Sequence, residues 1–410
     1  MFELEYWQRK AASLRFPDQA VIDGQRRAAQ SGQTFAAINP ATGQCLANVA
    51  ACGEEDVNAA VRNARQVFDA GTWAARSPTE RKQVLLRLAD LILDNREELA
   101  LLDSLNMGKP ITDAYNIDVP GAAGVFRWYA ESLDKLYDQV APSAQNVLAT
   151  IPREALGVVA AVVPWNFPLD MAAWKLAPAL ASGNSVILKP AEQSPFSALR
   201  LAELALEAGI PPGVLNVLPG LGEQTGKALG LHPDVDCLVF TGSTEVGKYF
   251  MQYSAQSNLK QVWLECGGKS ANLVFADCQD LDLAAQKAAF GIFFIRGEVC
   301  SANSRLLVQR SIHDEFVERL KAQAERWLPG DPLDPSSAAG AIVDSRQTAR
   351  IMKFIQQAEQ QGATRICGGQ QSIFNGSGNF IQPTIFTGVT PDMPLFRDEV
   401  FGPVLAVTAF

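Results

Sequence analysis

Residues 157–163 read Gly-Val-Val-Ala-Ala-Val-Val, a short apolar run that helical stretches follow. Four similar runs come after it along the chain, at 185–188, 214–218, 236–240 and 261–265. Strands that are apolar on both faces are typical of a parallel sheet covered by helices on each side. These five runs therefore predict an α/β lobe built on a parallel sheet.

The flanking segments enlarge this lobe and add a second one. Upstream, the sequence predicts two small hairpins, two amphipathic helices and one helix that a capping box opens; the ranges are 19–50 for the hairpins, 54–70 and 120–137 for the amphipathic helices, and Ser77 to beyond Leu101 for the capped helix. A second alternating set of apolar runs begins near Ala271. Two lobes that meet near residue 265 predict a ligand cleft at their junction.

Composition excludes several classes of protein. The chain has 410 residues, enough for two or three domains, and its net charge of -9 with scattered cations argues against a nucleic-acid partner. No leader or apolar stretch of membrane-spanning length opens or interrupts the chain, and the seven cysteines form no C-x-x-C pair, which predicts a cytoplasmic protein with no membrane partner. Only His232 and His313 are present, so neither a zinc site nor a Ser-His-Asp triad is expected.

Three polar side chains stand at the ends of predicted elements, each beside a glycine or proline. Cys300 lies just beyond Gly297 in an apolar stretch, where a lone cysteine is more often part of the core than a nucleophile. Glu265 stands at the end of a strand, and Cys266 and two glycines follow it, which points its carboxylate into a cleft unless it serves as a cap or ion pair. Asn166 follows the strand at 157–163.

Amide, carboxylate and thiol, in this order along the chain, resemble the three signature motifs of the aldehyde dehydrogenase superfamily. The resemblance runs from the turn at 39–43 to the Glu-Val-Phe-Gly-Pro-Val segment at 399–404. It implies an aldehyde dehydrogenase fold with a Rossmann-like NAD-binding domain at 1–137 and 156–264. It further implies an oligomerisation hairpin at 138–155 and a second α/β domain, the catalytic one, at 265–410.

The same resemblance implies the reaction, which is NAD-dependent oxidation of an aldehyde to a carboxylic acid. Cys300 would form a thiohemiacetal and then a thioester, because a thiolate attacks the aldehyde carbon. The Asn166 amide and the Cys300 backbone N–H would bind the oxyanion. Glu265 would activate the water that hydrolyses the thioester. Lys175 would lie beside these groups, although alone it indicates only a solvated helix position.

The cofactor site has no G-x-G-x-x-G fingerprint. The turn at 240–247 instead follows a strand and opens a helix, whose free N–H groups suit a pyrophosphate. By resemblance, Lys189 and Glu192 would bond the adenosine ribose hydroxyls, and the Glu192 carboxylate would favour NAD over NADP. The resemblance also assigns the other cofactor contacts to Trp165, Gly222, Gly226, Phe240, Gly242, Ser243, Val246, Glu399 and Phe401.

The substrate is expected to be an aminoaldehyde. Residues 6–8 and 117–140 most resemble bacterial aminoaldehyde dehydrogenases of polyamine and arginine breakdown, such as the gamma-glutamyl-gamma-aminobutyraldehyde and guanidinobutyraldehyde enzymes. A helix that begins near Phe167 would place Asn166, Asp170 and Trp174 on one face, so Phe167, Asp170 and Trp174 are the expected substrate residues. Asp170 replaces an apolar tunnel residue of the family; it either caps the helix start or attracts the distal cation of the substrate.

Several positions depart from the family's pattern. Ile295-Arg296 replace an Asn-Gln pair, and Asn303 and Ala177 replace glycines, which bears on catalytic efficiency. The family's sequence also continues beyond the position of Phe410, so we expect a missing C-terminal end. Its absence would weaken the family's homo-oligomer by removing a strand that pairs with a neighbour.

Two alternatives follow from these departures. One is a truncated, non-catalytic remnant that only binds dinucleotide, which the presence of Cys300, Glu265 and Asn166 opposes. The other is a CoA-acylating aldehyde dehydrogenase. Glu265 opposes it, because those relatives release the acyl group with a thiol rather than with activated water.

Overall fold

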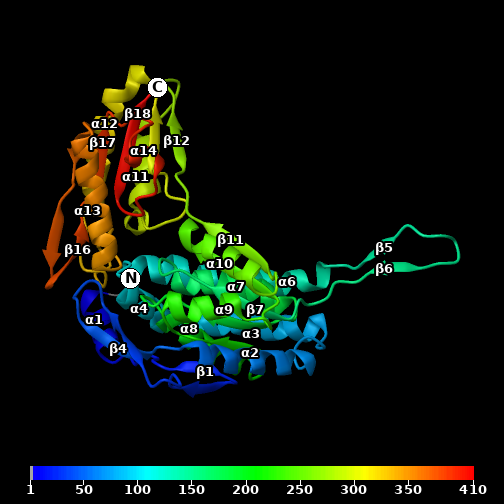
Figure 1. The fold of residues 1–410 in the computed structure, drawn as a ribbon. Helices are drawn as coiled ribbons and strands as arrows, with labels where there is room; N and C mark the ends of the chain where they lie inside the picture. The colour runs from blue at the N-terminus through cyan, green and yellow to red at the C-terminus, as the bar shows by residue number, and fades with distance from the viewer. Residues whose placement is uncertain (1–2) are drawn as a thin grey trace.

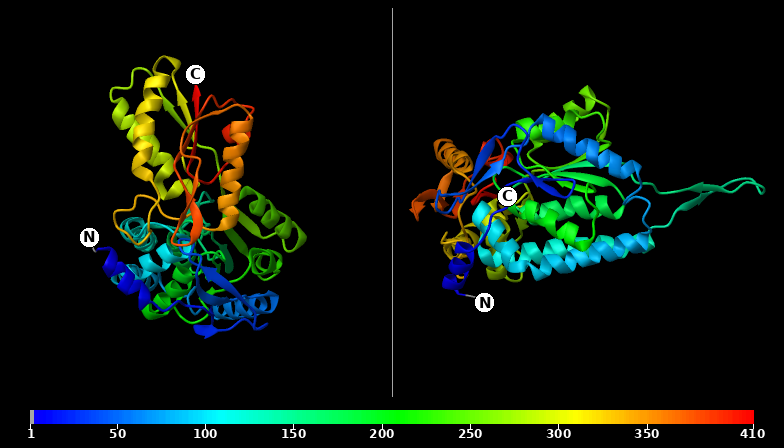
Figure 2. Two further views of the ribbon diagram at one scale, coloured as in Figure 1. Left: turned by 90° about the vertical axis from the view of Figure 1, so that its left-hand side faces the viewer. Right: turned by 90° about the horizontal axis from the view of Figure 1, so that it is seen from below.

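The computed structural model describes residues 3–410, which form two α/β layers and a projecting arm (Figure 1). The first sheet and its helices hold the N-terminal two thirds of the chain, and the second sheet stands above them (Figures 1 and 2). Within residues 3–410, no helix has the length and apolar character that crossing a lipid bilayer requires.

The first sheet has seven strands, which are, in spatial order, β11 (Gln261–Cys266), β10 (Cys237–Gly242), β7 (Val158–Val162), β8 (Ser185–Lys189), β9 (Leu215–Val217), β1 (Ala20–Ile22) and β2 (Gln25–Arg27). The five strands from β11 to β9 are parallel, which confirms the predicted sheet and the α/β class. The sequence did not predict that β1 adds to this sheet, antiparallel to β9 with Val21 opposite Val217.

Helices cover both faces of this sheet. Successive β7 side chains point to opposite sides and all are apolar, so each face has an apolar surface to bury. Val158, Ala160 and Val162 pack in one apolar cluster with residues of α2 (Glu54–Asp69) and α10 (Thr244–Gln256). Val159 and Ala161 pack in the other cluster. That cluster includes residues of α3 (Pro78–Asp94), α4 (Arg96–Met107), α6 (Val119–Ser132), α7 (Pro168–Ala181) and α8 (Phe196–Ala208).

The helix expected to run from Ser77 past Leu101 is two helices, and the prediction of one was wrong. The capping box is present, since Ser77 Oγ accepts from Glu80 N and the Glu80 carboxylate accepts from Ser77 N. The break comes at Asn95, which ends α3 and precedes α4 with ψ at 24°. Its side-chain amide donates to Leu91 O at 2.8 Å, a local bond that competes with helix continuation.

The second sheet has five strands, which are, in spatial order, β12 (Ala271–Val274), β13 (Arg305–Val308), β18 (Val404–Ala409), β17 (Thr384–Thr387) and β14 (Thr364–Cys367). All neighbours are parallel except β14 and β17. The helices of this layer are α11 (Leu281–Phe293), α12 (His313–Ala324), α13 (Ser345–Gln360) and α14 (Pro394–Arg397). Because the first sheet ends at Cys266 and the second begins at Ala271, four residues connect them.

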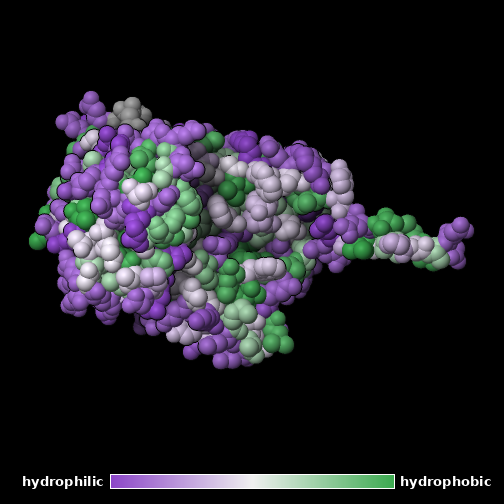
Figure 3. All heavy atoms as spheres, turned by 90° about the horizontal axis from the view of Figure 1, so that it is seen from above, coloured by the Kyte–Doolittle hydropathy of each residue, from purple (hydrophilic) through white to green (hydrophobic). Residues whose placement is uncertain are grey.

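The remaining elements are short. They are α1 (Leu4–Ala12), the predicted second hairpin of β3 (Thr34–Ile38) and β4 (Cys45–Ala50), α5 (Ile111–Asp113), α9 (Lys227–Leu231), and the pair β15 (Gln371–Phe374) and β16 (Ser377–Ile381). One hairpin, β5 (Gln139–Ala141) with β6 (Ala149–Ile151), reaches out as an arm with hydrophobic side chains along it (Figures 1 and 3). Its expected role in oligomerisation stays a prediction.

A buried ion pair lies between α4 and α6. Lys109 follows α4 and pairs with Asp118, and both side chains are fully buried. Gly108 makes this turn possible with φ at 76°, because a Cβ there would lie 2.5 Å from Ala341 O. The pair packs against Phe167, whose ring centroid is 3.8 Å from Lys109 Nζ.

We expect Asp118→Ala to lower the unfolding temperature strongly, because removing one partner of a buried pair typically costs roughly 3–5 kcal/mol. The control is Asp90→Ala, which breaks the solvent-exposed Arg127–Asp90 pair between α6 and α3. Thermal unfolding followed by circular dichroism should show a much larger shift for Asp118→Ala. Equal shifts would mean that the buried pair contributes no more than a surface pair.

Candidate active site

A cavity of about 310 Å³ lies at the carboxyl ends of β7, β10 and β11, where the two layers meet. Most of the side chains expected from the sequence line it: Trp165, Asn166, Phe167, Asp170, Trp174, Gly242, Ser243, Glu265, Cys300, Glu399 and Phe401. The structure thus gathers residues that are up to 236 positions apart, from Trp165 to Phe401, around one space.

The other expected residues lie outside the lining of this cavity. Lys189 ends β8 and Glu192 follows it, Gly222 and Gly226 bound a π-helical turn, and Val246 is in the first turn of α10. Phe240 is buried in the core, where its ring packs 5.0 Å from that of Phe250. Lys175 lies on α7, and the negative charge of Glu265 acts on the pKa of its ammonium group.

The nucleophile loop has a constrained backbone. Ile295, Arg296 and Gly297 all have positive φ, at 47°, 57° and 69°. This left-handed region costs roughly 1–2 kcal/mol for each residue with a Cβ. At Gly297 a Cβ would lie 2.2 Å from Gly402 O, so only glycine lets the loop approach the 399–403 segment. Cys300 follows in a turn at the cavity wall.

Burial and neighbouring groups set the ionisation of the Cys300 thiol. Burial raises the pKa of the Cys300 thiol, and the Glu265 carboxylate raises it further, while backbone N–H groups act in the opposite direction. Burial lowers the pKa of Lys175, and Glu265 opposes that shift. The same carboxylate therefore acts on both the thiol and the ammonium group.

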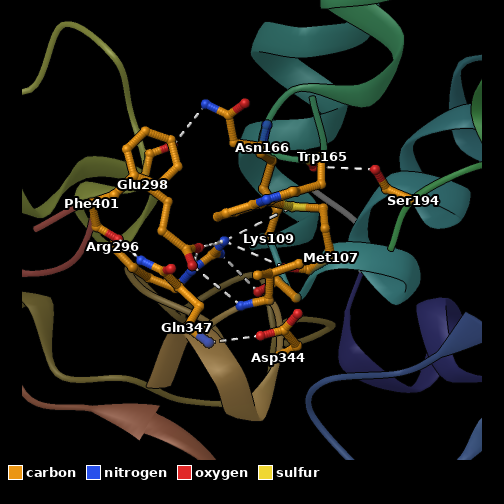
Figure 4. Close-up of polar contacts among 12 residues, drawn as sticks. Met107, Lys109, Trp165, Asn166, Ser194, Arg296, Glu298, Asp344, Gln347 and Phe401 are labelled. Carbon is orange, nitrogen blue, oxygen red and sulfur yellow. Dashed lines mark hydrogen bonds and ion pairs between the residues drawn. The ribbon is translucent and has the colours of Figure 1, made fainter. Parts of the chain in front are cut away.

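Asn166 is held by the nucleophile loop. Its side chain is buried, and its Nδ2 donates to Glu298 O at 2.9 Å (Figure 4). An amide nitrogen has two hydrogens, so one N–H is left for a ligand in the cavity. This geometry can stabilise an anion that develops next to Cys300.

The expected cofactor residues offer the chemistry that a dinucleotide needs. Lys189 is buried and donates to Glu192 Oε2 at 3.3 Å, so the pair presents a donor and an acceptor suited to the two hydroxyls of a ribose. Ser243 Oγ accepts from Val246 N as the N-cap of α10. The earlier N–H groups of this first turn have no helical partner and suit a pyrophosphate. The residues present therefore fit NAD.

Sequence reasoning missed two residues of α13 that hold the 399–401 segment. Gln347 Nε2 donates to Phe401 O at 2.7 Å, and Arg350 Nη2 donates to Glu399 O at 2.9 Å. Their spacing of three shows that they share a helix face, but no sequence signal indicates that this face meets the cavity. Phe401 itself has φ at 57°, and its ring lies edge-on to Trp165 at 5.3 Å.

Among residues 3–410, no group of three or more histidine, cysteine, aspartate or glutamate side chains is placed to hold a metal ion.

Comparison with known proteins identifies relatives along almost the whole chain. The profile of the Aldehyde dehydrogenase family matches residues 27–410. The NADP/NAD-dependent aldehyde dehydrogenase PuuC of Escherichia coli (strain K12) is 50% identical over 407 residues, which cover 99% of this chain and 81% of PuuC.

Two solved structures are similarly close. The gamma-glutamyl-gamma-aminobutyraldehyde dehydrogenase of Burkholderia cenocepacia J2315 superposes with a TM-score of 0.98 at 54% identity, covering 100% of this chain and 82% of that one. A mutant of the P. syringae indole-3-acetaldehyde dehydrogenase AldA, in complex with NAD+, has a TM-score of 0.99 at 50% identity, with 100% and 83% coverage.

We expect Glu265→Gln to lower the pH at which Cys300 becomes reactive, because removing the nearby negative charge favours the thiolate. The rate of iodoacetamide labelling should be measured against pH by mass spectrometry of the tryptic peptide 297–305, which contains one cysteine. The control is Glu245→Gln, on the exposed side of α10. An unchanged labelling midpoint in Glu265→Gln would place this carboxylate too far from the thiol to act on it.

Proposed function

The chain belongs to the aldehyde dehydrogenase family, and we propose that it oxidises a cationic aldehyde, an amino- or guanidino-aldehyde, through a thioester on Cys300. NAD-dependent oxidation of an aldehyde to a carboxylic acid is the function that this membership gives. The substrate class and the residue roles are the proposal. The carboxylate of Asp170 at the cavity wall is the observation that carries the substrate class.

The first step forms a bond between Cys300 Sγ and the aldehyde carbon. The thiolate is the reactive form, and the carbonyl oxygen becomes an alkoxide as the bond forms. Asn166 Nδ2 and the Cys300 backbone N–H donate to that oxygen, and one such donor is typically worth about 2.7–4 kcal/mol in the barrier. Asn166 is already oriented by Glu298 O before substrate enters.

The second step removes a hydride from the former aldehyde carbon and leaves a thioester on Cys300. NAD, when bound, would supply the hydride acceptor. Lys189 and Glu192 would hold the adenosine end, and the first turn of α10 would receive the pyrophosphate. Glu399 and Phe401 would hold the nicotinamide end, and Gln347 and Arg350 fix the backbone of these two residues.

The third step hydrolyses the thioester. Glu265 takes a proton from water, the resulting hydroxide adds to the acyl carbon, and the carboxylic acid leaves as Cys300 is regenerated. Glu265 is exposed to the cavity at the end of β11, so water can reach it. In this scheme residues 1–137 and 156–264 bind NAD, and residues 265–410 supply the nucleophile.

Asp170 forms no ion pair with a cation of the described chain. Lys109 acts on Asp170, but its ammonium group is paired with Asp118. Burial raises the pKa of Asp170 to about 6, and Asp118 acts in the same direction. Above that pH the carboxylate is ionised, and an unpaired, partly buried carboxylate is costly unless a ligand cation compensates it. A cationic group at the far end of the aldehyde supplies that partner.

The named relatives differ in the aldehyde that they act on. One structural relative is a gamma-glutamyl-gamma-aminobutyraldehyde dehydrogenase, whereas the other is an indole-3-acetaldehyde dehydrogenase. Phe167, Met171 and Trp174 give this cavity an apolar wall that would accept either chain. The charge of Asp170 is the feature that favours the cationic aldehyde.

We expect Asp170→Asn to reduce the preference for guanidinobutyraldehyde over indole-3-acetaldehyde by about tenfold to a hundredfold in kcat/KM. A charged hydrogen bond is worth about 1.5–3 kcal/mol, and the isosteric amide keeps the shape of the side chain. In the parent, the preference should also fall as pH drops through about 6, where Asp170 loses its charge. A ratio of two substrates cancels the ionisation of Cys300.

The control is Asp113→Asn. Burial raises the pKa of Asp113 to about 6 as well, but this residue does not line the cavity. The Asp113→Asn variant should prefer guanidinobutyraldehyde over indole-3-acetaldehyde by the same ratio as the parent. If Asp170→Asn leaves the ratio unchanged, or if the parent prefers the indole substrate at every pH, the cationic substrate class is wrong.

A further inference from the structure

A buried ion pair lies within the nucleophile loop. Arg296 and Glu298 are almost completely shielded from solvent, with side-chain exposures of 2% and 0%. Arg296 Nε donates to Glu298 Oε2 at 2.9 Å, and Nη2 donates to the same oxygen (Figure 4). None of the three reaction steps above uses either charge.

This pair ties the nucleophile loop to two other segments. Arg296 Nη1 donates to Gly108 O at 2.9 Å, beyond the end of α4. Glu298 Oε1 accepts from Val343 N at 3.2 Å, just before α13. Both charges are therefore satisfied by fixed partners, which is the condition for a buried ion pair to be rigid.

Glu298 accepts hydrogen bonds both from Arg296 and from Asn166, the candidate oxyanion donor. Glu298 accepts from Asn166 Nδ2 with its backbone oxygen and from Arg296 with its carboxylate. The side chain and the carbonyl share one Cα, so fixing the first restricts the second. Burial raises the pKa of Glu298 to about 7 and Arg296 opposes this shift, so the guanidinium also keeps the carboxylate available as an acceptor.

We propose that Arg296 and Glu298 act as positioning residues that orient the Asn166 amide for oxyanion binding. We call the pair the Arg296–Glu298 clamp. The clamp holds the carbonyl that fixes one N–H of Asn166, so the other N–H points into the cavity. This inference rests on the proposed role of Asn166 in aldehyde oxidation.

The backbone explains why the loop requires such a clamp. Ile295 and Arg296 occupy the left-handed region, which a β-branched and a long side chain rarely adopt without support. The Arg296 guanidinium reaches back to the carbonyl oxygens of Met107 and Gly108, and this holds the strained turn in place. Without these bonds the loop can relax and carry the Glu298 carbonyl with it.

The test is a double-mutant cycle between Arg296→Met and Asn166→Ala, measured by steady-state oxidation with saturating NAD. We expect Asn166→Ala to lower kcat about a hundredfold or more, and Arg296→Met to lower it about tenfold to a hundredfold. The aldehyde KM should change less than threefold in Arg296→Met, because the lost interaction acts in the transition state. In the double variant, Arg296→Met should add almost nothing to the loss from Asn166→Ala.

Two further variants separate positioning from general destabilisation. Arg296→Lys keeps a charge for Glu298 and should recover most of kcat. If the Met variant does not fold, Arg296→Gln, which keeps hydrogen-bond donors but removes the charge, takes its place in the cycle. Asp236→Asn loosens the bond to Val158 N at the amino end of β10, far from the cavity. Asp236→Asn should lower the unfolding temperature but keep kcat within threefold. In combination with Asn166→Ala, the fold-changes in kcat of the two substitutions should simply multiply.

Each failure has a distinct meaning. Parental kcat in Arg296→Met, or losses that multiply fully with Asn166→Ala, would overturn the clamp while leaving the reaction scheme intact. Parental kcat in Asn166→Ala would instead overturn the proposed oxyanion site on which the clamp depends.

Discussion

The hydrogen bond from Asn166 Nδ2 to Glu298 O joins the two layers at the point where chemistry is expected. Asn166 belongs to the turn after β7 in the first layer, whereas Glu298 belongs to the nucleophile loop that leads into the second. The edge-on contact of Trp165 with Phe401 repeats this link one residue away. Cys300, Asn166 and Phe401 can face one cavity because this junction holds the two layers together.

The junction is built at a cost in stability. It includes left-handed residues at 295 and 296, buried charges at Lys109, Arg296 and Glu298, and an unpaired carboxylate at Asp170. Such features usually cluster where structure serves binding or catalysis rather than stability. The apolar clusters on both faces of the first sheet, by contrast, follow ordinary rules of burial and offset that cost.

The sequence predicted what depends on local pattern. Uniformly apolar runs predicted the five parallel strands, and the resemblance to the aldehyde dehydrogenase motifs predicted that Asn166, Glu265 and Cys300 would meet. It did not predict the break at Asn95, because the apolar periodicity continues across it, or the antiparallel addition of β1, which depends on long-range pairing. Arg296 was identified only as a departure from the family. Arg296 bonds to Gly108, 188 positions away, and to Glu298, 2 positions away. A local sequence pattern cannot predict the first of these bonds, because it depends on how distant segments pack.

The central claim is that oxidation passes through an acyl group on Cys300, which Glu265 helps to release. The most direct measurement mixes Glu265→Gln with NAD and an aldehyde, quenches with acid within the first turnover, and weighs the tryptic peptide 297–305. We expect a burst of about one NADH per chain and a matching acyl mass on Cys300. A burst with no acyl group on this peptide, or with an acyl group on another residue, would show that Cys300 is not the nucleophile.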